Sequence, residues 1–231
     1  WIERIIIKPI CFVKFRKPYL PMIKYVIPAR RNSKGLPFKN RKLISRTLDT
    51  LPKNILKDTI LTTDDEILLE MGKEYGVNCV NRDPELALDE TSTKDVMLDL
   101  KKRKLITDPD VVIMLYLTYP ERTWLDINKA LNFYNDNLAK SLLCKKEIKG
   151  THPYLYLLDV DNIRGKQLTP HNLYRRQDYP KVFELSHFIC IFNVNELEDL
   201  NNNLYNDNTI FYNIEDVIDV DTIDDLNKLN D

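Results

Sequence analysis

This sequence has few glycines and histidines and a net charge close to zero, and these shortages limit its structure and its function. Glycine occupies only 5 of 231 positions, so each glycine is expected where the backbone needs unusual freedom. The 3 histidines (His152, His171 and His187) lie far apart, and no two cysteines have C-x-x-C spacing, so no zinc-binding pattern is present. A formal net charge of −1 supplies no global field to attract nucleic acid or an anionic membrane, and we expect neither as a partner.

Long hydrophobic runs are missing as well, and cysteine is rare. No stretch reaches the roughly 18 uncharged apolar residues that a membrane span needs. Three of the 4 cysteines fall in apolar runs, which predicts reduced, buried thiols, a reducing compartment and a cytoplasmic protein. A structural disulfide among Cys11, Cys79, Cys144 and Cys190 is the less favoured alternative.

The sequence does contain enough apolar material for one domain with a full core. Its residues are 43% hydrophobic and 30% charged, which is typical of a globular chain. Residues 1–21 are basic and lack the layout of a signal peptide, and Met22 directly precedes a strand pattern. We expect residues 1–21 to be an upstream extension that is not part of the fold, and residues 22–231 to form the domain. A basic surface anchor is the alternative for the extension.

Strand-like and helical patterns alternate from residue 24 to residue 144. Strands are predicted at 24–29, 59–62, 77–80, 111–117 and 141–144. Helices are predicted at 45–51, from a cap at Asp64 or Asp65 to Gly76 with Ile67 on the apolar face, after a cap at Ser92, and at 124–134 after a capping box of Thr123 and Asp126. Such alternation is typical of an α/β fold with a mostly parallel, Rossmann-like sheet and helices on both faces. Further strands are predicted at 188–192, 209–212 and 217–220, before a closing helix from Thr222.

Residues 150–185 interrupt this alternation. They contain three prolines and many tyrosines but few helical patterns. A segment of this length and composition does not predict a second domain with its own core. We therefore interpret residues 150–185 as a β-rich arm inserted into the main fold.

The loop after the first predicted strand, residues 30–40, reads RRNSKGLPFKN. Basic side chains alternate with small ones, and Gly35 lets the backbone turn close to a ligand. Ligands of such sheets bind outside the carboxyl ends of the strands, so this loop can surround a polyphosphate with cations and backbone N–H groups. The loop lacks Walker A spacing, and a solvated basic turn is the alternative interpretation.

Asp219 and Asp221 form a second candidate site near the end of the chain. On the strand predicted at 217–220, residues two apart face the same side, so the two carboxylates would repel unless a cation lay between them. Mg²⁺ favours a few carboxylates together with phosphate oxygens. A solvated acidic strand is the alternative, but together with the basic loop the pair favours a nucleoside triphosphate, Mg²⁺ and nucleotidyl transfer.

Six motifs in order resemble those of the acylneuraminate cytidylyltransferase family, the CMP-sialic acid synthetases. The resemblance spans roughly residues 23–229 and is carried by residues 27–40, Thr62-Thr63-Asp64, residues 82–93, residues 118–123, residues 176–182 and residues 218–222. It implies a fold like that of nucleotide-diphospho-sugar transferases. It also implies that the protein uses CTP to convert a sialic acid-like nonulosonic acid to its CMP-sugar, with release of pyrophosphate.

The resemblance also implies site residues and partners. The implied catalytic residues are Arg30, Lys34, Asp219 and Asp221, of which the two aspartates would hold Mg²⁺ as the cofactor. The implied nucleotide-binding residues are Arg30, Ser33, Lys34, Lys39, Asn40, Arg82, Thr91, Ser92 and Thr93. The family works as a homodimer, which implies a dimerisation arm at about 150–185.

The departures from the family pattern gather on the sugar side. Tyr116 stands where the family has a sugar-contacting Gln, Leu155 replaces a common Lys, and Ser186-His187 replaces an Asn-Gly pair. The sugar-side candidates are Tyr116, Tyr119, Arg122, Arg176, Gln177 and His187. For the two tyrosines, buried stacking is the alternative, and His187 has the alternative of a satisfied structural histidine.

These departures favour a nonulosonic acid other than sialic acid itself, such as a deoxy or diamino relative. Activation of a 3-deoxy-octulosonate sugar is an alternative within the same class, although that family lacks the motif at Arg176-Gln177-Asp178. A non-catalytic nucleotide-binding protein on the same fold is the alternative from another class. Fold likeness alone does not choose between these functions, because sites are grafted onto folds.

Overall fold

The computed structural model describes residues 21–33, 35–148, 156–158 and 164–229. The expectations for the upstream extension, Lys34, His152 and Leu155 therefore lie outside the described residues, and so does Cys11. Within the described part of the chain, no helix combines the length and the apolar character that crossing a membrane would require.

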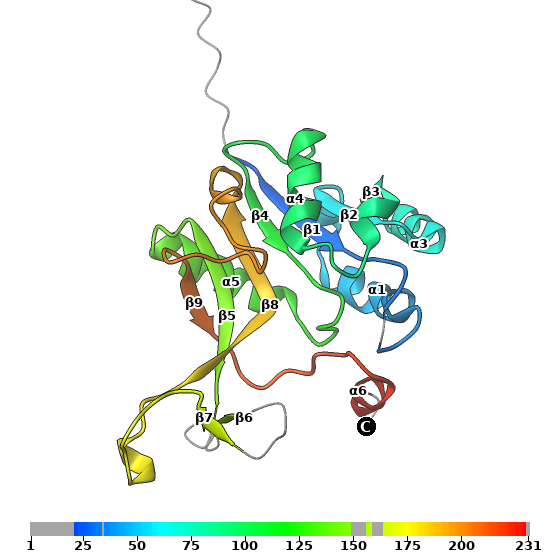
Figure 1. The fold of residues 1–231 in the computed structure, drawn as a ribbon. Coiled ribbons are helices and arrows are strands. Elements are labelled where there is room, and N and C mark those ends of the chain that lie inside the picture. The colour runs from blue at the N-terminus through cyan, green and yellow to red at the C-terminus, as the bar shows by residue number, and fades with distance from the viewer. Residues whose placement is uncertain (1–20, 34, 149–155, 159–163, 230–231) are drawn as a thin grey trace, which may run out of the picture.

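A seven-stranded sheet with the order β3-β2-β1-β4-β8-β5-β9 forms the centre of the fold (Figure 1). Its strands are β1 (Ile23–Pro28), β2 (Thr59–Thr63), β3 (Asn78–Asn81), β4 (Val111–Met114), β5 (Ser141–Glu147), β8 (Phe183–Asn193) and β9 (Ile210–Asn213). Strands β3, β2, β1 and β4 pair in parallel, and so do β5 and β9. Strand β8 runs antiparallel between β4 and β5, so the predicted mostly parallel sheet is confirmed with one reversed strand.

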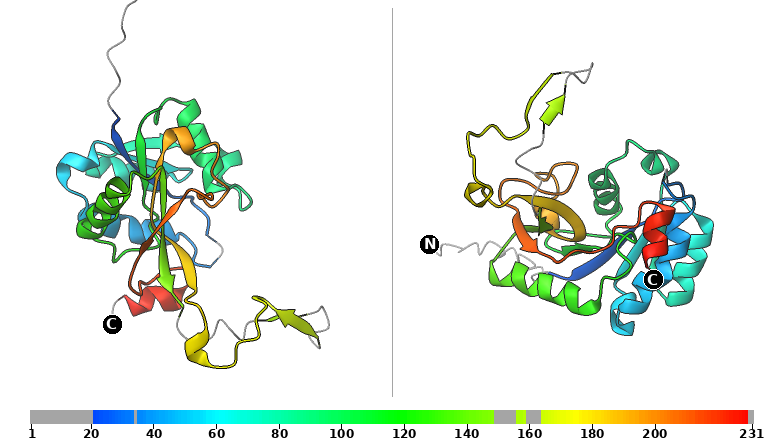
Figure 2. Two further views of the ribbon diagram at one scale, coloured as in Figure 1. Left: turned by 90° about the vertical axis from the view of Figure 1, so that its left-hand side faces the viewer. Right: turned by 90° about the horizontal axis from the view of Figure 1, so that it is seen from below.

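Helices cover both faces of the sheet, as predicted (Figure 2). The α-helices are α1 (Lys39–Thr50), α2 (Lys53–Leu56), α3 (Glu66–Tyr75), α4 (Thr93–Lys102), α5 (Trp124–Asp136) and α6 (Ile223–Lys228), with short 3-10 turns η1 (Pro84–Ala87), η3 (Arg176–Asp178) and η4 (Val194–Glu196). Buried side chains of α1, α3 and α5 form one core, and those of α4 and residues 194–204 form the other. Alternate residues of β1 serve the two cores, with Ile27 in the first and Val26 in the second.

Local capping signals explain where several helices begin. Ser92 and Thr123 each form a capping box with the aspartate three residues later, and Asp65 accepts a hydrogen bond from Ile67 N–H at the start of α3. Helix α3 ends at Gly76, whose φ of 78° lies in the left-handed region that glycine adopts without strain. These predicted caps are confirmed.

Four details of the sequence prediction are wrong. Residues 217–220 form no strand; this segment leaves the sheet after β9, and Val220 N–H donates to Thr118 O at 2.8 Å. Strand β4 ends at Met114 rather than at residue 117, and helix α1 begins six residues earlier than predicted, at Lys39. Ile67, predicted on the apolar face of α3, is 44% exposed because that face is centred on Leu68 and Gly72.

The predicted arm leaves the sheet where β5 ends and returns through β8 (Figure 1). Its described part contains a two-stranded antiparallel sheet of β6 (Tyr156–Leu158) and β7 (Gly165–Gln167), followed by η3. The views in Figures 1 and 2 place these elements away from the main sheet. The predicted β-rich character is confirmed, whereas its role in dimerisation stays a prediction.

Candidate active site

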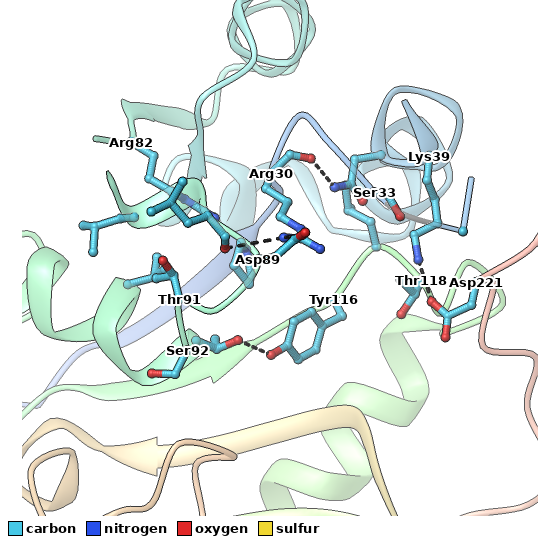
Figure 3. A pocket seen from close by; sticks show the side chains of 18 of the residues that line it. Arg30, Ser33, Lys39, Arg82, Asp89, Thr91, Ser92, Tyr116, Thr118 and Asp221 are labelled. Carbon is cyan, nitrogen blue, oxygen red and sulfur yellow. Dashed lines mark hydrogen bonds and ion pairs between the residues drawn. The ribbon is translucent and has the colours of Figure 1, made fainter. Parts of the chain in front are cut away.

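One pocket with a volume of about 460 Å³ lies at the carboxyl ends of β1, β3 and β4 (Figure 3). Its polar lining comes from four parts of the chain that are distant in sequence. The lining includes Arg30, Ser33, Gly35, Lys39, Asn40, Arg82, Asp89, Thr91, Ser92, Thr93, Tyr116, Thr118, Asp221 and Thr222. The structure therefore brings together eight of the nine predicted nucleotide-binding residues, while Lys34 lies outside the described residues.

The loop that follows β1 is held in place by four hydrogen bonds, one of which is also an ion pair. Asn40 donates through Nδ2 to Arg30 O at 2.8 Å, and Arg31 N–H donates to Asp64 Oδ1 at 2.7 Å. The Arg30 guanidinium forms an ion pair with Asp89 at 2.5 Å and also donates to Leu88 O. These bonds place Arg30 at the rim of the pocket, one-third exposed, where its charge faces an incoming ligand (Figure 3).

Lys39 connects this loop to the predicted metal-binding acids. The first residue of α1, Lys39 has an 8% exposed side chain whose Nζ donates to Asp221 Oδ1 at 2.7 Å. Gly35 approaches the same segment so closely that a Cβ atom at position 35 would lie 2.3 Å from Asp221 O. Glycine is therefore required at position 35 for the loop and the acidic segment to meet.

Arg82 forms the inner wall of the pocket. Its side chain is buried, it donates to Thr62 O at 2.8 Å, and its Nε atom has no hydrogen-bond partner within the described residues. Burial lowers the pKa of the Arg82 guanidinium to about 10, while the charge of Asp64 opposes this shift. A buried cation with an unused donor at a pocket wall favours an anionic or hydrogen-bond-accepting ligand.

The residues at the start of α4 line the opposite side. Thr91 Oγ1 donates to Glu85 O at 3.0 Å, and Ser92 uses its hydroxyl in the capping box. Thr93 Oγ1 lies 2.5 Å from Tyr116 Oη, a hydrogen bond that crosses the pocket floor. The N-terminus of α4 therefore lies at a pocket that already carries the cations Arg30 and Lys39, an arrangement suited to an anion.

Tyr116, Tyr119 and His187 form an aromatic group beside the pocket. The rings of Tyr116 and His187 meet edge to face with centroids 5.4 Å apart, and His187 Nε2 lies 3.0 Å from Asn203 O. Burial raises the pKa of Tyr116 to about 12, so its hydroxyl stays protonated at neutral pH. Tyr119 is 6% exposed and accepts a hydrogen bond from Ser186 Oγ, and burial raises its pKa further still.

Three sugar-side candidates lie elsewhere. Arg122, a candidate partner for a carboxylate or hydroxyls of the sugar, is 2% exposed and donates to Phe188 O and Tyr116 O, so both bonded arms of its guanidinium are committed to backbone. Arg176 and Gln177 belong to η3 in the arm, which lies away from the pocket in this chain (Figure 1). The burial of Arg122 is not visible in its local motif.

Asp219 and Asp221 retain the alternation that the sequence predicted, although no strand forms there. Val220 between them is fully buried and both aspartates are exposed. No group of three or more His, Cys, Asp or Glu residues that could hold a metal ion occurs within the described residues. Of the two, Asp221 lines the pocket and pairs with Lys39, whereas Asp219 is not among the lining residues. An exposed carboxylate at a cationic pocket fits Mg²⁺, which takes one or two protein carboxylates and completes its shell with phosphate and water.

Sequence reasoning did not assign a site role to Asp89, Thr118 or Thr222. Asp89 pairs with Arg30, and Thr118 O accepts the hydrogen bond that fixes Val220 between the two predicted metal ligands. All three residues lie in the motifs that carry the family resemblance, so these motifs could have indicated them as site residues. Their contacts join segments 59 and 102 residues apart and follow only from the tertiary structure.

The fold and the pocket define an α/β protein whose ligand site lies on a cationic loop at the carboxyl ends of parallel strands. A family model described as cytidylyltransferase matches residues 25–183, and the chain belongs to that family. It is 29% identical over 213 residues to an N-acylneuraminate cytidylyltransferase of Streptococcus agalactiae serotype V, covering 87% of this chain. The chain spans 51% of the length of that relative, about half.

Two other similar proteins extend this comparison. A pseudaminic acid cytidylyltransferase of Campylobacter jejuni is 28% identical over 170 residues, which cover 68% of this chain and 72% of that protein. The structure of a CMP:2-keto-3-deoxy-manno-octonic acid synthetase complexed with CTP has a TM-score of 0.64 and 15% identity, covering 90% of this chain and 96% of that one. At that identity the structural likeness shows a shared fold, and the predicted nucleotide-diphospho-sugar transferase-like architecture is confirmed.

Proposed function

We propose that this protein uses CTP to activate a sialic acid-like nonulosonic acid, forming a CMP-sugar and pyrophosphate. The observation that carries the proposal is the convergence of Arg30, Lys39, Arg82 and Asp221 on one pocket. These residues supply three cations and a carboxylate, the groups that a bound triphosphate and its metal ion need. The relatives named for N-acylneuraminate and pseudaminic acid cytidylyl transfer support the same class of acceptor.

The proposed reaction is a direct transfer. The anomeric hydroxyl oxygen of the sugar acid attacks the α-phosphorus of CTP, the bond from that phosphorus to its bridging oxygen breaks, and pyrophosphate departs with the bonding electrons. The hydroxyl proton is released. Arg30 and Lys39, with Lys34 from the same loop, would stabilise the charge that develops on the pyrophosphate.

Asn40 and Arg82 are proposed to recognise the ribose and the cytosine, with Thr91, Ser92 and Thr93 beside them. Arg82 suits this role because its buried Nε donor has no partner within the described residues. Mg²⁺, held by Asp219 and Asp221, would neutralise phosphate charge and orient the α-phosphate when bound.

The sugar side of the pocket is proposed to be aromatic. Tyr116 and His187 stand where the resembled family has Gln and Asn-Gly, so this wall offers ring faces and one hydroxyl instead of an amide. Such a wall suits an acceptor that carries methyl or acetamido groups, as deoxy and diamino nonulosonic acids do.

The proposal includes a homodimer built through the arm. Leu157, Leu168 and Tyr174 of the arm are 52%, 51% and 92% exposed, an apolar set that a second copy would cover. Arg176 and Gln177, remote from the pocket of their own chain, would then reach the partner's site. Solution mass measured by light scattering tests this, and a strict monomer at assay concentration would contradict it.

We also propose a cytoplasmic location, where CTP is available and thiols stay reduced. Cys79, Cys144 and Cys190 are free, and burial raises the pKa of each of these thiols, which makes them unreactive. Fractionation of the native host cell followed by immunodetection tests the location. Recovery from an oxidising compartment would contradict it.

The enzymatic proposal is tested by pyrophosphate release with CTP and Mg²⁺ across sialic, pseudaminic and 3-deoxy-octulosonic acids. Release with a nonulosonic acid is expected. Release with the octulosonic acid alone would assign the protein to the alternative activation. Intact CTP binding without release from any acid would favour a non-catalytic nucleotide-binding protein.

A further inference from the structure

Both hydrogen-bonded ladders of β8 break at the same place, beside the pocket. The β4–β8 ladder runs from Val111 opposite Asn193 to Met114 opposite Cys190 and then stops. The β5–β8 ladder pairs Leu143 with Cys190 but Cys144 with Ser186, which leaves residues 187–189 outside the regular register. This irregularity is a bulge in β8, a feature that re-aims side chains near functional sites.

Arg122 occupies the gap that these two breaks leave. Continued in the same register, the β4–β8 ladder would place Tyr116 opposite Phe188. Instead, Arg122 Nη1 donates to Phe188 O at 2.7 Å and Nη2 donates to Tyr116 O at 2.9 Å. One guanidinium therefore links a carbonyl of β8 to a carbonyl of the segment that directly follows β4.

The location of this cation is unfavourable for stability. Arg122 is 2% exposed, burial lowers its pKa to about 10, and it directly precedes Thr123, the N-cap of α5, where the helix dipole is positive. A hydrophobic side chain of similar volume often stabilises such a position better than a buried charge. The two oriented carbonyl contacts are what only an arginine supplies here.

The side chains on either side of the gap form the aromatic wall beside the pocket. Tyr116, released from the ladder, crosses to Thr93 at 2.5 Å, and His187, on the bulge, meets the edge of the Tyr116 ring. Phe188 stacks edge to face with Tyr119 at a centroid distance of 5.6 Å. All four aromatic residues thus depend on where β4 and β8 separate.

We propose that Arg122 is a positioning residue that, by linking the segment after β4 to the bulge of β8, sets Tyr116 and His187 as the specificity wall for the sugar acid. It does not touch the sugar or CTP itself. The expected change in KM for the sugar acid rests on the proposed function. The expected change in the positions of Tyr116 and residues 187–189 rests on geometry alone.

Three variants test the proposal kinetically: Arg122→Lys, Tyr116→Phe and the double variant. Arg122→Lys keeps the charge but cannot hold both carbonyls in one plane. It is expected to raise KM for the sugar acid about tenfold while KM for CTP changes less than about threefold. In the Tyr116→Phe background the same substitution is expected to have a much smaller effect, because coupled residues are not additive.

Thr209→Val is the matched control for lost stability. Thr209 is 6% exposed and shares a buried hydrogen bond of 2.7 Å with Ser141 at the opposite edge of the sheet from the pocket. This variant is expected to lower the melting temperature while both KM values stay unchanged. An equal rise in both KM values for Arg122→Lys, or full additivity with Tyr116→Phe, would overturn the proposal.

A crystal structure of Arg122→Lys tests the geometry independently of turnover. Tyr116 Oη is expected to leave Thr93, and residues 187–189 are expected to shift toward regular pairing. An unmoved Tyr116 would refute the positioning role even if the wild type proves active. Absence of pyrophosphate release in the wild type would refute the proposed function but not this structural outcome.

Discussion

Lys39 Nζ lies 2.7 Å from Asp221 Oδ1, although 182 residues separate them in sequence. The lysine begins α1 at the end of the cationic loop, and the aspartate belongs to the segment that returns from β9, the edge strand (Figure 1). Figure 3 shows the two side chains meeting. The Lys39 side chain is only 8% exposed, whereas the side chain of Asp221, to which it donates, is 70% exposed. The contact ties the proposed phosphate loop to the proposed metal ligand, and four predictions follow from this arrangement and its surroundings.

Replacing Lys39 by methionine removes a cation that the proposed pyrophosphate would contact and leaves Asp221 without this bond. Lys39→Met is expected to lower kcat/KM for pyrophosphate release about 100-fold, the size of effect seen when one oriented charge-stabilising donor is lost. Lys42→Met, an exposed position three residues later on α1, is the control and should act like the wild type. Equal activity of the two variants would contradict a role for Lys39.

Neutralising the paired acids tests the metal site. Asp219→Asn and Asp221→Asn are each expected to reduce turnover at least about 100-fold, because metal stabilisation of transition-state charge contributes several kcal/mol. Mn²⁺ binding in the presence of CTP, followed by paramagnetic relaxation, should weaken in parallel. Asp216→Asn, an exposed acid on the same segment, serves as the control. Unchanged Mn²⁺ binding in both site variants would place the metal elsewhere.

Two glycines separate an effect on the site from an effect on stability. A Cβ at position 35 would lie 2.3 Å from Asp221 O, so Gly35→Ala should displace the acidic segment and cost about tenfold or more in activity. Gly76 has φ +78°, and a Cβ atom added there would meet nothing within 4 Å, so Gly76→Ala should cost about 1 kcal/mol of unfolding free energy and leave activity intact. Urea unfolding and pyrophosphate release measure both. An active Gly35→Ala variant would show that the two segments need not approach.

The stability that Asp65 provides should depend on pH in the acid range. Burial alone would raise the pKa of this carboxyl. Hydrogen bonds from Arg41 and from Ile67 N–H, together with the charge of Arg41, outweigh the effect of burial, so the pKa lies below its usual value. Because the folded-state pKa is lowered, the contribution is complete above the unfolded pKa of about 3.9 and is lost as pH falls through the folded value.

Asp65→Asn keeps a capping side chain and removes the charge. It is expected to cost roughly 1–3 kcal/mol at pH 7, as for hydrogen bonds to charged groups. The difference from the wild type should shrink as unfolding is measured at successively lower pH below about 4. A difference that stays constant down to pH 3 would show that the charge is not what stabilises the folded state.

The caps and the strand order along the chain were readable from sequence because their causes are local. Ser92 and Asp95, or Thr123 and Asp126, lie three residues apart and form their capping boxes within one helical turn. The motif residues of the cationic loop were likewise recognisable in order. The burial of Arg122 was not readable, since its local sequence shows a cation and not the carbonyls of Tyr116 and Phe188 to which it donates.

Sequence alone determined the alternation of strands and helices, the caps of α3, α4 and α5 and the types of residue available for a triphosphate, because periodicity and capping depend on neighbours within a few positions. Tertiary structure alone decided that residues 217–220 leave the sheet, that Lys39 and Asp221 meet, and that β8 reverses and bulges beside Tyr116. Those features require segments up to 182 residues apart to pack together. Their positions follow from how the whole chain buries its two cores on a twisted sheet and not from any local pattern.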